Sequence, residues 1–249
     1  MSVAVTNKIK FTANSQNFSK IPGSPIAYWV SETVIKAFDG ELLSDYGATK
    51  QGFATGDNEK FLRLWNEVNF YKIGFNRTSC EDFLNSGYLY APCNKGGEAR
   101  KWYGNNNITC KFDKMAYNQL AQQGNHLPSK DFYFKEGLTW SALSSGCLTM
   151  RFAPQGYVFE TKGSRFFSRE PEKSKYILAL MNSKVVMVAL QILCPTIDFH
   201  EGPVSKVPII FDKTKKKEVL FKSDESILIA KKDWDSYETS WDFKKHPLI

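Results

Sequence analysis

The sequence predicts a mixed α/β fold, with helical and strand patterns in different parts of the chain. Apolar residues recur at helical spacing near the amino terminus and again between residues 176 and 193. From Leu138 onward, apolar and polar residues alternate, as they do in half-buried strands. The chain has 249 residues, 42% of them hydrophobic, so it is long enough to bury a large core without disulfides or a metal.

Two helices are expected in the first seventy residues, after a polar stretch, Met1 to Lys20, that we expect to be loosely ordered. Ser24 would cap the first helix, with Pro25 at its first position and Asp39-Gly40 at its end. Its apolar face would be Ile26, Trp29, Val30 and Val34.

The second helix would begin at Asp57 or Asn58, with an apolar face of Phe61, Leu62, Trp65 and Val68. A glycine-rich turn, residues 51–58, precedes it. Such a turn either holds a phosphate oxygen on backbone N–H groups or simply joins a strand to a helix, and both interpretations remain open.

A loop over residues 92–106 combines cations with aromatic side chains. Its cations can meet phosphates or guanine edges, and its aromatic rings can stack or wedge. The alternative is a solvated hairpin tip with a buried tryptophan. The residues concerned are Lys95, Arg100, Lys101, Trp102 and Tyr103, with Asn105 as a polar neighbour.

A β-hairpin is expected after the strand pattern of Leu148, Met150 and Phe152. Residues 153–156 would form its turn and residues 157–161 its returning strand. Basic residues at its end either touch a backbone phosphate or only aid solubility. These are Lys162 and Arg165, which flank Ser164.

The most apolar stretch, residues 176–193, predicts two buried helices or one bent helix, because Asn182, Ser183 and Lys184 interrupt it. The charged run from Lys213 to Glu218 is expected to be a solvated loop. An aromatic and acidic stretch, residues 233–243, follows near the carboxyl terminus.

Charge and cysteine content restrict the partners and the compartment. The formal net charge is +7, which favours an anionic partner, most commonly a polyanion. The five cysteines are odd in number, lack Cys-x-x-Cys spacing and follow no secretory signal. We therefore expect free thiols, no structural metal, no membrane segment and a cytoplasmic location.

Several catalytic motifs are missing from the sequence. It has no Gly-x-Gly, no Pro-Pro dipeptide, no phosphate-binding P-loop and no Gly-x-Ser-x-Gly elbow. We therefore expect no methyl-transfer site and no cofactor in this chain. One enzyme-like pattern remains: Glu160-Thr-Lys162, with Asp131 and Glu136 upstream, resembles the metal-binding residues of a Mg²⁺-dependent nuclease.

Six segments resemble, in order, signature segments of PglX-type adenine-specific DNA methyltransferases, the modification enzymes of BREX phage-defence systems. The resemblance begins at the Ile21-Pro-Gly-Ser-Pro-Ile-Ala-Tyr-Trp29 stretch and covers nearly the whole chain. The remaining segments are residues 52–65, 97–105, 137–141, 180–184 and 233–243. The chain departs from the pattern at His200-Glu-Gly-Pro-Val204, where the family suggests Gln-Val-Gly-Asp-Ile.

The resemblance implies a target-recognition region without its catalytic domain. It implies an α/β domain like the specificity modules of type I and type IIG restriction–modification systems, docked in the major groove and followed by packed helices. We expect a linking segment over residues 1–45, the recognition domain over 46–210 and a carboxyl-terminal segment over 211–249. The intact family enzyme would use S-adenosylmethionine.

Three functions follow as hypotheses. The first is sequence-specific recognition of double-stranded DNA for adenine methylation in phage defence. The second is a protein-interaction or specificity-exchange fragment that docks on a partner methyltransferase or another phage-defence component, and the third is the nuclease. The expected DNA contacts are Lys95, Arg100, Lys101, Trp102, Tyr103, Asn105, Ser141, Arg151, Lys162 and Arg165.

Overall fold

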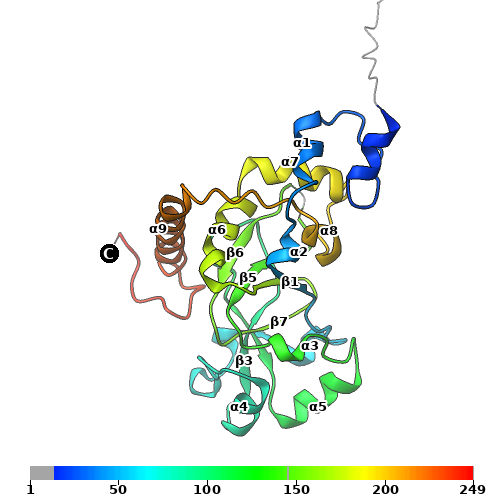
Figure 1. Cartoon of the computed structure of the whole chain (residues 1–249). Helices are drawn as coiled ribbons and strands as arrows, with labels where there is room; N and C mark the ends of the chain where they lie inside the picture. Colours follow the sequence, from blue (N-terminus) through cyan, green and yellow to red (C-terminus); the bar gives the residue numbers. More distant parts are fainter. Residues whose placement is uncertain (1–13, 145, 249) are drawn as a thin grey trace, which may run out of the picture.

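Two four-stranded sheets, each with its own apolar core, form the centre of the protein (Figure 1). The structure is a computed structural model and describes residues 14–144 and 146–248. The first sheet is antiparallel throughout. Its strands, in spatial order, are β1 (Gly47–Lys50), β8 (Arg165–Ser168), β5 (Gly137–Trp140) and β6 (Met150–Ala153). The strand pattern expected from Leu138 is confirmed by β5 and β6.

The second sheet is mixed, because β3 pairs antiparallel with β4 but parallel with β7. Its strands, in spatial order, are β2 (Leu62–Leu64), β4 (Ile108–Lys111), β3 (Tyr90–Asn94) and β7 (Val158–Phe159). Phe83, Phe112 and Phe134 are completely buried in an aromatic core beside this sheet. The helical elements of this half are α3 (Asn58–Phe61), η2 (Trp65–Glu67), η3 (Phe70–Lys72), α4 (Cys80–Asn85), α5 (Lys114–Gln122) and η4 (Lys130–Phe132).

Helices pack on the first sheet and complete its core. Ile177, Leu178 and Met181 of α6 are fully buried against Trp140 and Phe166 of the sheet. The elements are α2 (Leu43–Tyr46), α6 (Pro171–Met181), α7 (Lys184–Leu193) and α8 (Glu201–Ser205). The predicted pair of helices is confirmed, since α6 and α7 are bent by 82° at the Asn182-Ser183 break.

Among the described residues, no single helix is both long and apolar enough to cross a membrane. Only the bent pair of α6 and α7 passes such a test of length and composition. The five cysteines are free, as expected.

The first helix begins later than the sequence predicts. Ser31, not Ser24, caps α1 (Glu32–Ala37), and its hydroxyl accepts the N–H of Val34. Ser24 instead has a φ of +49°, which is incompatible with a helix cap. Ile26 and Trp29, expected on the buried face, are 73% and 53% exposed. Of the stretch expected to be loosely ordered, residues 1–13 lie outside the described residues, and Ser15–Lys20 form the 3₁₀ helix η1.

The second helix begins at the predicted residue but is short. Asp57 caps α3 and accepts the N–H of Lys60, as expected. The chain then leaves the helix at Leu62 to form β2, because Leu62 pairs with Cys110 in the sheet. The apolar residues expected on one helix face are therefore divided between α3, β2 and η2, and Val68 follows η2 in an extended conformation.

The glycine-rich turn before α3 uses its backbone for packing. The N–H groups of Phe53 and Ala54 donate to Phe159 O (3.1 Å) and Asn125 Oδ1 (2.6 Å). A Cβ at Gly52 would lie 2.0 Å from the carbonyl oxygen of Phe159, so no larger residue fits there. These contacts favour the structural interpretation of the turn over a phosphate site.

The predicted hairpin is wrong. β6 pairs with β5 in the first sheet, whereas β7 pairs with β3 in the second. The turn at residues 154–156 therefore carries the chain from one sheet to the other. Gly156 makes this possible, because its φ is +102° and its Cα lies against the backbone of Asn76.

The charged run from Lys213 to Glu218 is only partly a loop, because α9 (Lys216–Trp234) begins within it. The helix packs along α6 (Figure 1). Its Ser223 hydroxyl donates to Lys175 O at 3.0 Å, and its Asp224 pairs with the Lys175 ammonium. This helix, which the sequence analysis missed, returns the following acidic stretch toward the sheets.

Candidate nucleic-acid interface

The basic loop, defined here as residues 95–107, connects β3 to β4 and also touches the first sheet. Trp102 donates its N–H to Met150 O at 3.0 Å and accepts the N–H of Phe152 at 2.8 Å. Trp102 and Asn105 have positive φ values of +72° and +58°, which non-glycine residues adopt rarely. The basic loop is therefore fixed against β6 and is not a free hairpin tip.

Arg151 supports the basic loop from inside. Its guanidinium donates to Arg100 O (3.3 Å) and to Ser141 Oγ (3.4 Å), and the Ser141 hydroxyl donates to Gly97 O (2.9 Å). The Arg151 side chain is 1% exposed, and burial, with the nearby Arg100 charge, lowers its pKa to about 10. The expectation that Arg151 and the buried Ser141 contact DNA needs correction, because neither side chain reaches the surface.

Arg165 is also buried, between the two sheets. It donates to Lys135 O at 2.9 Å and to Asn94 Oδ1, and its guanidinium lies over the rings of Tyr157 and Phe159. Burial lowers its pKa to about 10. The expected position at a solvated hairpin end is wrong, since Arg165 lies within β8, a central strand of the first sheet.

The outer surface of the basic loop carries the remaining predicted cations. The Arg100 guanidinium pairs with Asp233 at 2.8 Å and lies 5.1 Å from the centre of the Trp234 ring. Both charged side chains are partly exposed, at 32% and 54%. Lys162, which follows β7 in the sequence, is exposed. Its ammonium has no hydrogen-bond or ion-pair partner within the described part of the chain.

The other predicted loop residues have structural contacts. The Lys101 ammonium donates to Asn182 O at 2.8 Å, and Asn105 Nδ2 donates to Glu98 O at 2.9 Å. Tyr103 is buried, with the Lys231 ammonium 5.2 Å from its ring centre, so the expectation that it contacts DNA needs the same correction as that for Ser141. Trp102 is partly buried against the first core.

Asn182 is a positioning residue that the sequence analysis did not single out. Its side-chain amide pairs with both backbone groups of Met150, each at 2.9 Å, while its own carbonyl accepts Lys101. One residue thus connects the α6–α7 bend, β6 and the basic loop, through its side chain to β6 and through its backbone carbonyl to Lys101. The signal in the sequence was a polar residue interrupting an otherwise apolar helical stretch.

A cleft of about 470 Å³ lies where the basic loop meets the carboxyl-terminal segment. Its lining combines two cations, two amides and an aromatic ring, which are side-chain types that contact phosphates and base edges, with one carboxylate, that of Glu98. The residues are Lys95, Arg100, Asn105, Asn107, Trp234 and Thr239, together with residues 96–98 and Ile108. The contribution of Trp234 and Thr239 could not be inferred locally, because they are more than 120 positions further along the chain.

The predicted metal-binding pattern does not assemble. Both Glu160 carboxylate oxygens accept local hydrogen bonds, from the Thr161 hydroxyl (2.7 Å) and the Lys162 N–H (2.9 Å). Asp131 lies instead in a cleft beside Cys80. Residues 14–144 and 146–248 hold no group of three or more His, Cys, Asp or Glu side chains that could bind a metal ion. The nuclease hypothesis therefore gains no support from the geometry.

Comparison with known proteins relates the chain to one class of enzyme. No protein-family model matches the chain. Two curated bacterial proteins do match, and both are adenine-specific methyltransferases. The chain is homologous to a portion of these methyltransferases over nearly all of its own length.

The first of these relatives is PglX of Lacticaseibacillus casei (strain Zhang), 33% identical over 252 aligned residues, or 96% of this chain. The second is BrxX of Escherichia coli O9:H4 (strain HS), 38% identical over 236 residues, or 94% of this chain. The chain spans about a fifth of their length, 20% and 18% respectively. The predicted resemblance to PglX-type enzymes is thereby confirmed.

The buried arrangement of Arg151 generates a prediction. We expect Arg151→Met to increase amide hydrogen exchange in residues 97–102, because the carbonyls of Gly97 and Arg100 lose their fixed support. Hydrogen exchange read by mass spectrometry measures this directly. Lys162→Ala, which removes an exposed cation, should leave exchange there unchanged; equal exchange in Arg151→Met and the parent protein would show that Arg151 does not position the loop.

Proposed function

We propose that this chain is the sequence-specific DNA-recognition module of an N6-adenine DNA methyltransferase in BREX phage defence. The observation that carries the proposal is its homology, along nearly its whole length, to about a fifth of two adenine-specific methyltransferases. The sequence lacks the cofactor loop and the Pro-Pro segment of the catalytic domain. Methyl transfer from S-adenosylmethionine would then be the task of another part of the enzyme.

The basic loop is the DNA-reading element in this proposal. Lys95, Arg100, Lys101 and Lys162 supply positive charge on or near its outer surface, and Trp102 and Asn105 complete its proposed contact set. Phosphate contacts would fix the register on the duplex, while Arg100 and Asn105 would read base edges. Ser141, Arg151 and Arg165 act indirectly, by holding the loop and the two sheets in place.

The domain organisation is part of the same proposal. Residues 46–210 would form the target-recognition domain, comparable to type I and type IIG specificity modules, and residues 1–45 would link it to a methyltransferase domain. Residues 211–249 would complete the DNA-facing cleft, because Trp234 and Thr239 line it together with the basic loop.

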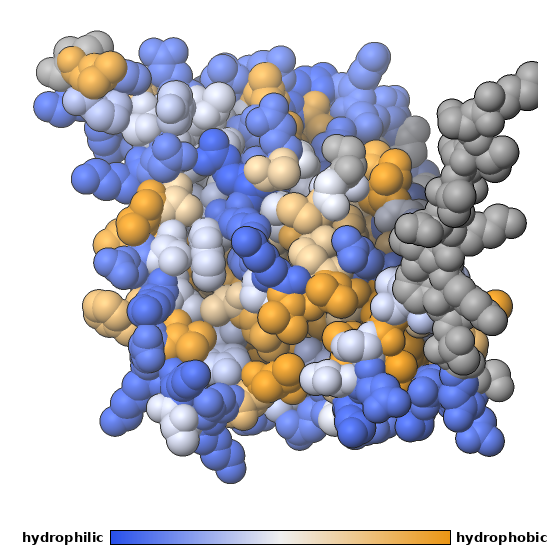
Figure 2. Space-filling model, turned by 90° about the horizontal axis from the view of Figure 1, so that it is seen from above, coloured by the Kyte–Doolittle hydropathy of each residue, from blue (hydrophilic) through white to orange (hydrophobic). Residues whose placement is uncertain are grey.

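A second candidate function, docking on a methyltransferase domain, is favoured by an apolar groove between α1 and α7. Val185, Val188 and Ile210 in this groove are 62%, 43% and 56% exposed. Figure 2 shows apolar side chains gathered on the face of the molecule that carries these helices. Such a patch is typical of a protein–protein contact, and we assign it to the methyltransferase domain that the longer relatives contain.

Replacing Arg100 tests the proposed DNA-reading role. Arg100→Ala should reduce discrimination between target and non-target duplexes by about 1–3 kcal/mol, because a bidentate contact to guanine would be lost. Competition binding with a pool of duplex sequences, followed by sequencing of the bound fraction, measures the change. An unchanged sequence preference would contradict the assignment, and Arg169→Ala, an exposed cation outside the loop, is the matched control.

Asp233 competes with the DNA base edge for the Arg100 guanidinium in this proposal. Asp233→Asn should therefore tighten duplex binding by roughly threefold to tenfold, since a partly exposed ion pair contributes less than about 1 kcal/mol and a repelling carboxylate is also removed. Fluorescence anisotropy with a labelled duplex measures the affinity. Asp224→Asn breaks a comparable pair with Lys175 on the α6–α9 contact and should leave the affinity unchanged. Equal effects of the two variants would contradict the competition.

The docking candidate is tested by co-purification. Val185→Asp combined with Val188→Asp should abolish capture of a separately expressed methyltransferase domain from a PglX relative, because two charges would enter the apolar contact. Capture that persists would remove the groove from the docking hypothesis. Arg100→Ala should leave capture intact, which separates docking from DNA reading.

A further inference from the structure

A cleft beside the second sheet lies between α4 and α5, away from the basic loop. Its volume is about 740 Å³, which is within the usual range for small-molecule sites. None of the ten residues predicted to contact DNA lines it. Figure 1 places α4 and α5 at the end of the molecule opposite α1 and α7.

Two helix faces and the segment around η4 form the walls of this α4–α5 cleft. Each helix contributes residues at spacings of three and four, so the side chains of one face line the same space. The residues are Glu81, Leu84 and Asn85 from α4, and Lys114, Tyr117 and Asn118 from α5. The third wall, η4 with the residues that follow it, contributes Lys130, Asp131, Tyr133 and Lys135.

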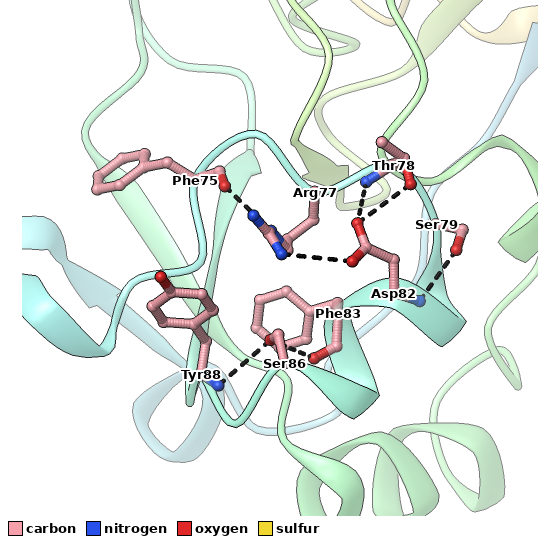
Figure 3. Close-up of polar contacts among 8 residues, drawn as sticks. All are labelled: Phe75, Arg77, Thr78, Ser79, Asp82, Phe83, Ser86 and Tyr88. Carbon is pink, nitrogen blue, oxygen red and sulfur yellow. Dashed lines mark hydrogen bonds and ion pairs between the residues drawn. The ribbon is translucent and has the colours of Figure 1, made fainter.

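The α4 wall is held in place by a local hydrogen-bond network (Figure 3). Asp82 accepts the N–H and the hydroxyl of Thr78, at 2.8 and 3.1 Å, and pairs with Arg77 at 3.3 Å. The Ser79 hydroxyl accepts the Asp82 N–H at 3.0 Å. These contacts fix the chain that leads into α4, so the cleft is preformed on this side.

The opposite wall is held by unusual backbone conformations. Leu127, Ser129 and Phe134 have φ values of +50°, +60° and +66°. Non-glycine residues adopt this region at a cost, and such residues concentrate where the chain must present particular side chains. Here they flank Lys130 and Tyr133, two of the residues that line the cleft.

The side chains in the cleft have unused hydrogen-bonding capacity. In the described part of the chain, the ammonium groups of Lys114 and Lys130, the Tyr117 hydroxyl, and the amides of Asn85 and Asn118 have neither a hydrogen bond nor an ion pair. The Tyr133 hydroxyl, by contrast, donates to Pro128 O. Three ammonium groups, of Lys114, Lys130 and Lys135, and two carboxylates, of Glu81 and Asp131, therefore line one concave space, which leaves one positive charge in excess. Two amides and the half-buried Tyr117 ring line it with them.

This combination matches one ligand chemistry. Ammonium groups bind phosphate as point charges, an aromatic ring stacks on a base, and an amide can both donate to and accept from a base edge. We propose that the α4–α5 cleft binds a nucleotide, with its phosphate on Lys114 and Lys130 and its base against Tyr117. Asn85 and Asn118 hydrogen-bond to the base edge.

The nucleotide comes either from the free pool or from a DNA strand, and the cleft chemistry is the same for both. The site shares no residue with the basic loop, so it stands independently of the DNA-reading role proposed above. Arg100→Ala should therefore leave nucleotide binding unchanged, whereas changes in the cleft remove it.

Titration of the full chain with deoxyadenosine monophosphate, followed by calorimetry, tests the proposal. We expect saturable binding that weakens about tenfold or more in the Lys114→Ala, Lys130→Ala double variant, since charge-assisted hydrogen bonds to the phosphate are lost. Tyr117→Ala should also weaken it, and Tyr117→Phe should not, because stacking needs only the ring. Inorganic phosphate alone and deoxyadenosine alone should each bind more weakly than the nucleotide.

The matched control is the Lys213→Ala, Lys217→Ala double variant, which removes the same charge from exposed positions outside the cleft. No saturable binding at nucleotide concentrations up to about 10 mM, or equal weakening in the control, overturns the proposal. A deoxyadenosine trinucleotide that binds more tightly than the mononucleotide assigns the ligand to a DNA strand. A trinucleotide that binds more weakly assigns it to the free pool, and either result supports the cleft as a nucleotide site.

Discussion

The buried guanidinium of Arg165 is the contact on which the two-sheet arrangement depends. It extends from β8 in the first sheet to Asn94 in β3 of the second, and it also binds Lys135 O. The described residues offer it no carboxylate; backbone and amide oxygens and the faces of Tyr157 and Phe159 surround the charge instead. Removing such a group would leave buried acceptors unpaired, which is costly in a dry interior.

The contact between Arg165 and Asn94 also fixes the position of the basic loop. Asn94, which accepts from Arg165, is the last residue of β3, and its amide also donates to Asn106 Oδ1 at 3.0 Å, so both ends of the loop meet one side chain. Arg151 and Asn182 then fix its middle. A loop held this way can present Arg100 in one orientation, and presenting cations at fixed positions is what distinguishes base reading from general attraction to DNA.

Local sequence patterns predicted several features that depend only on neighbouring residues. The cap at Asp57, the strand from Leu138 and the break at Asn182 all follow from neighbouring residues. The pairing of β6 with β5 and of β7 with β3 does not follow from neighbouring residues, because the residues of a turn do not determine which strands pair with the two strands it joins. The same limit applies to the site. The charges of Arg151 and Arg165 suggested solvent exposure, but both side chains are buried, because the basic loop covers Arg151 in β6 and the second sheet covers Arg165 in β8. The Arg100–Asp233 pair joins residues 133 positions apart, beyond the reach of any sequence pattern.

The central claim is that this chain itself reads duplex DNA, and binding across a salt series with random-sequence competitor tests it most directly. The logarithm of the affinity should fall linearly with the logarithm of salt concentration, with a slope set by the number of phosphates contacted. A subset of duplex sequences should stay bound in the presence of the competitor. Absence of duplex binding by the purified chain, even at low salt, would contradict it.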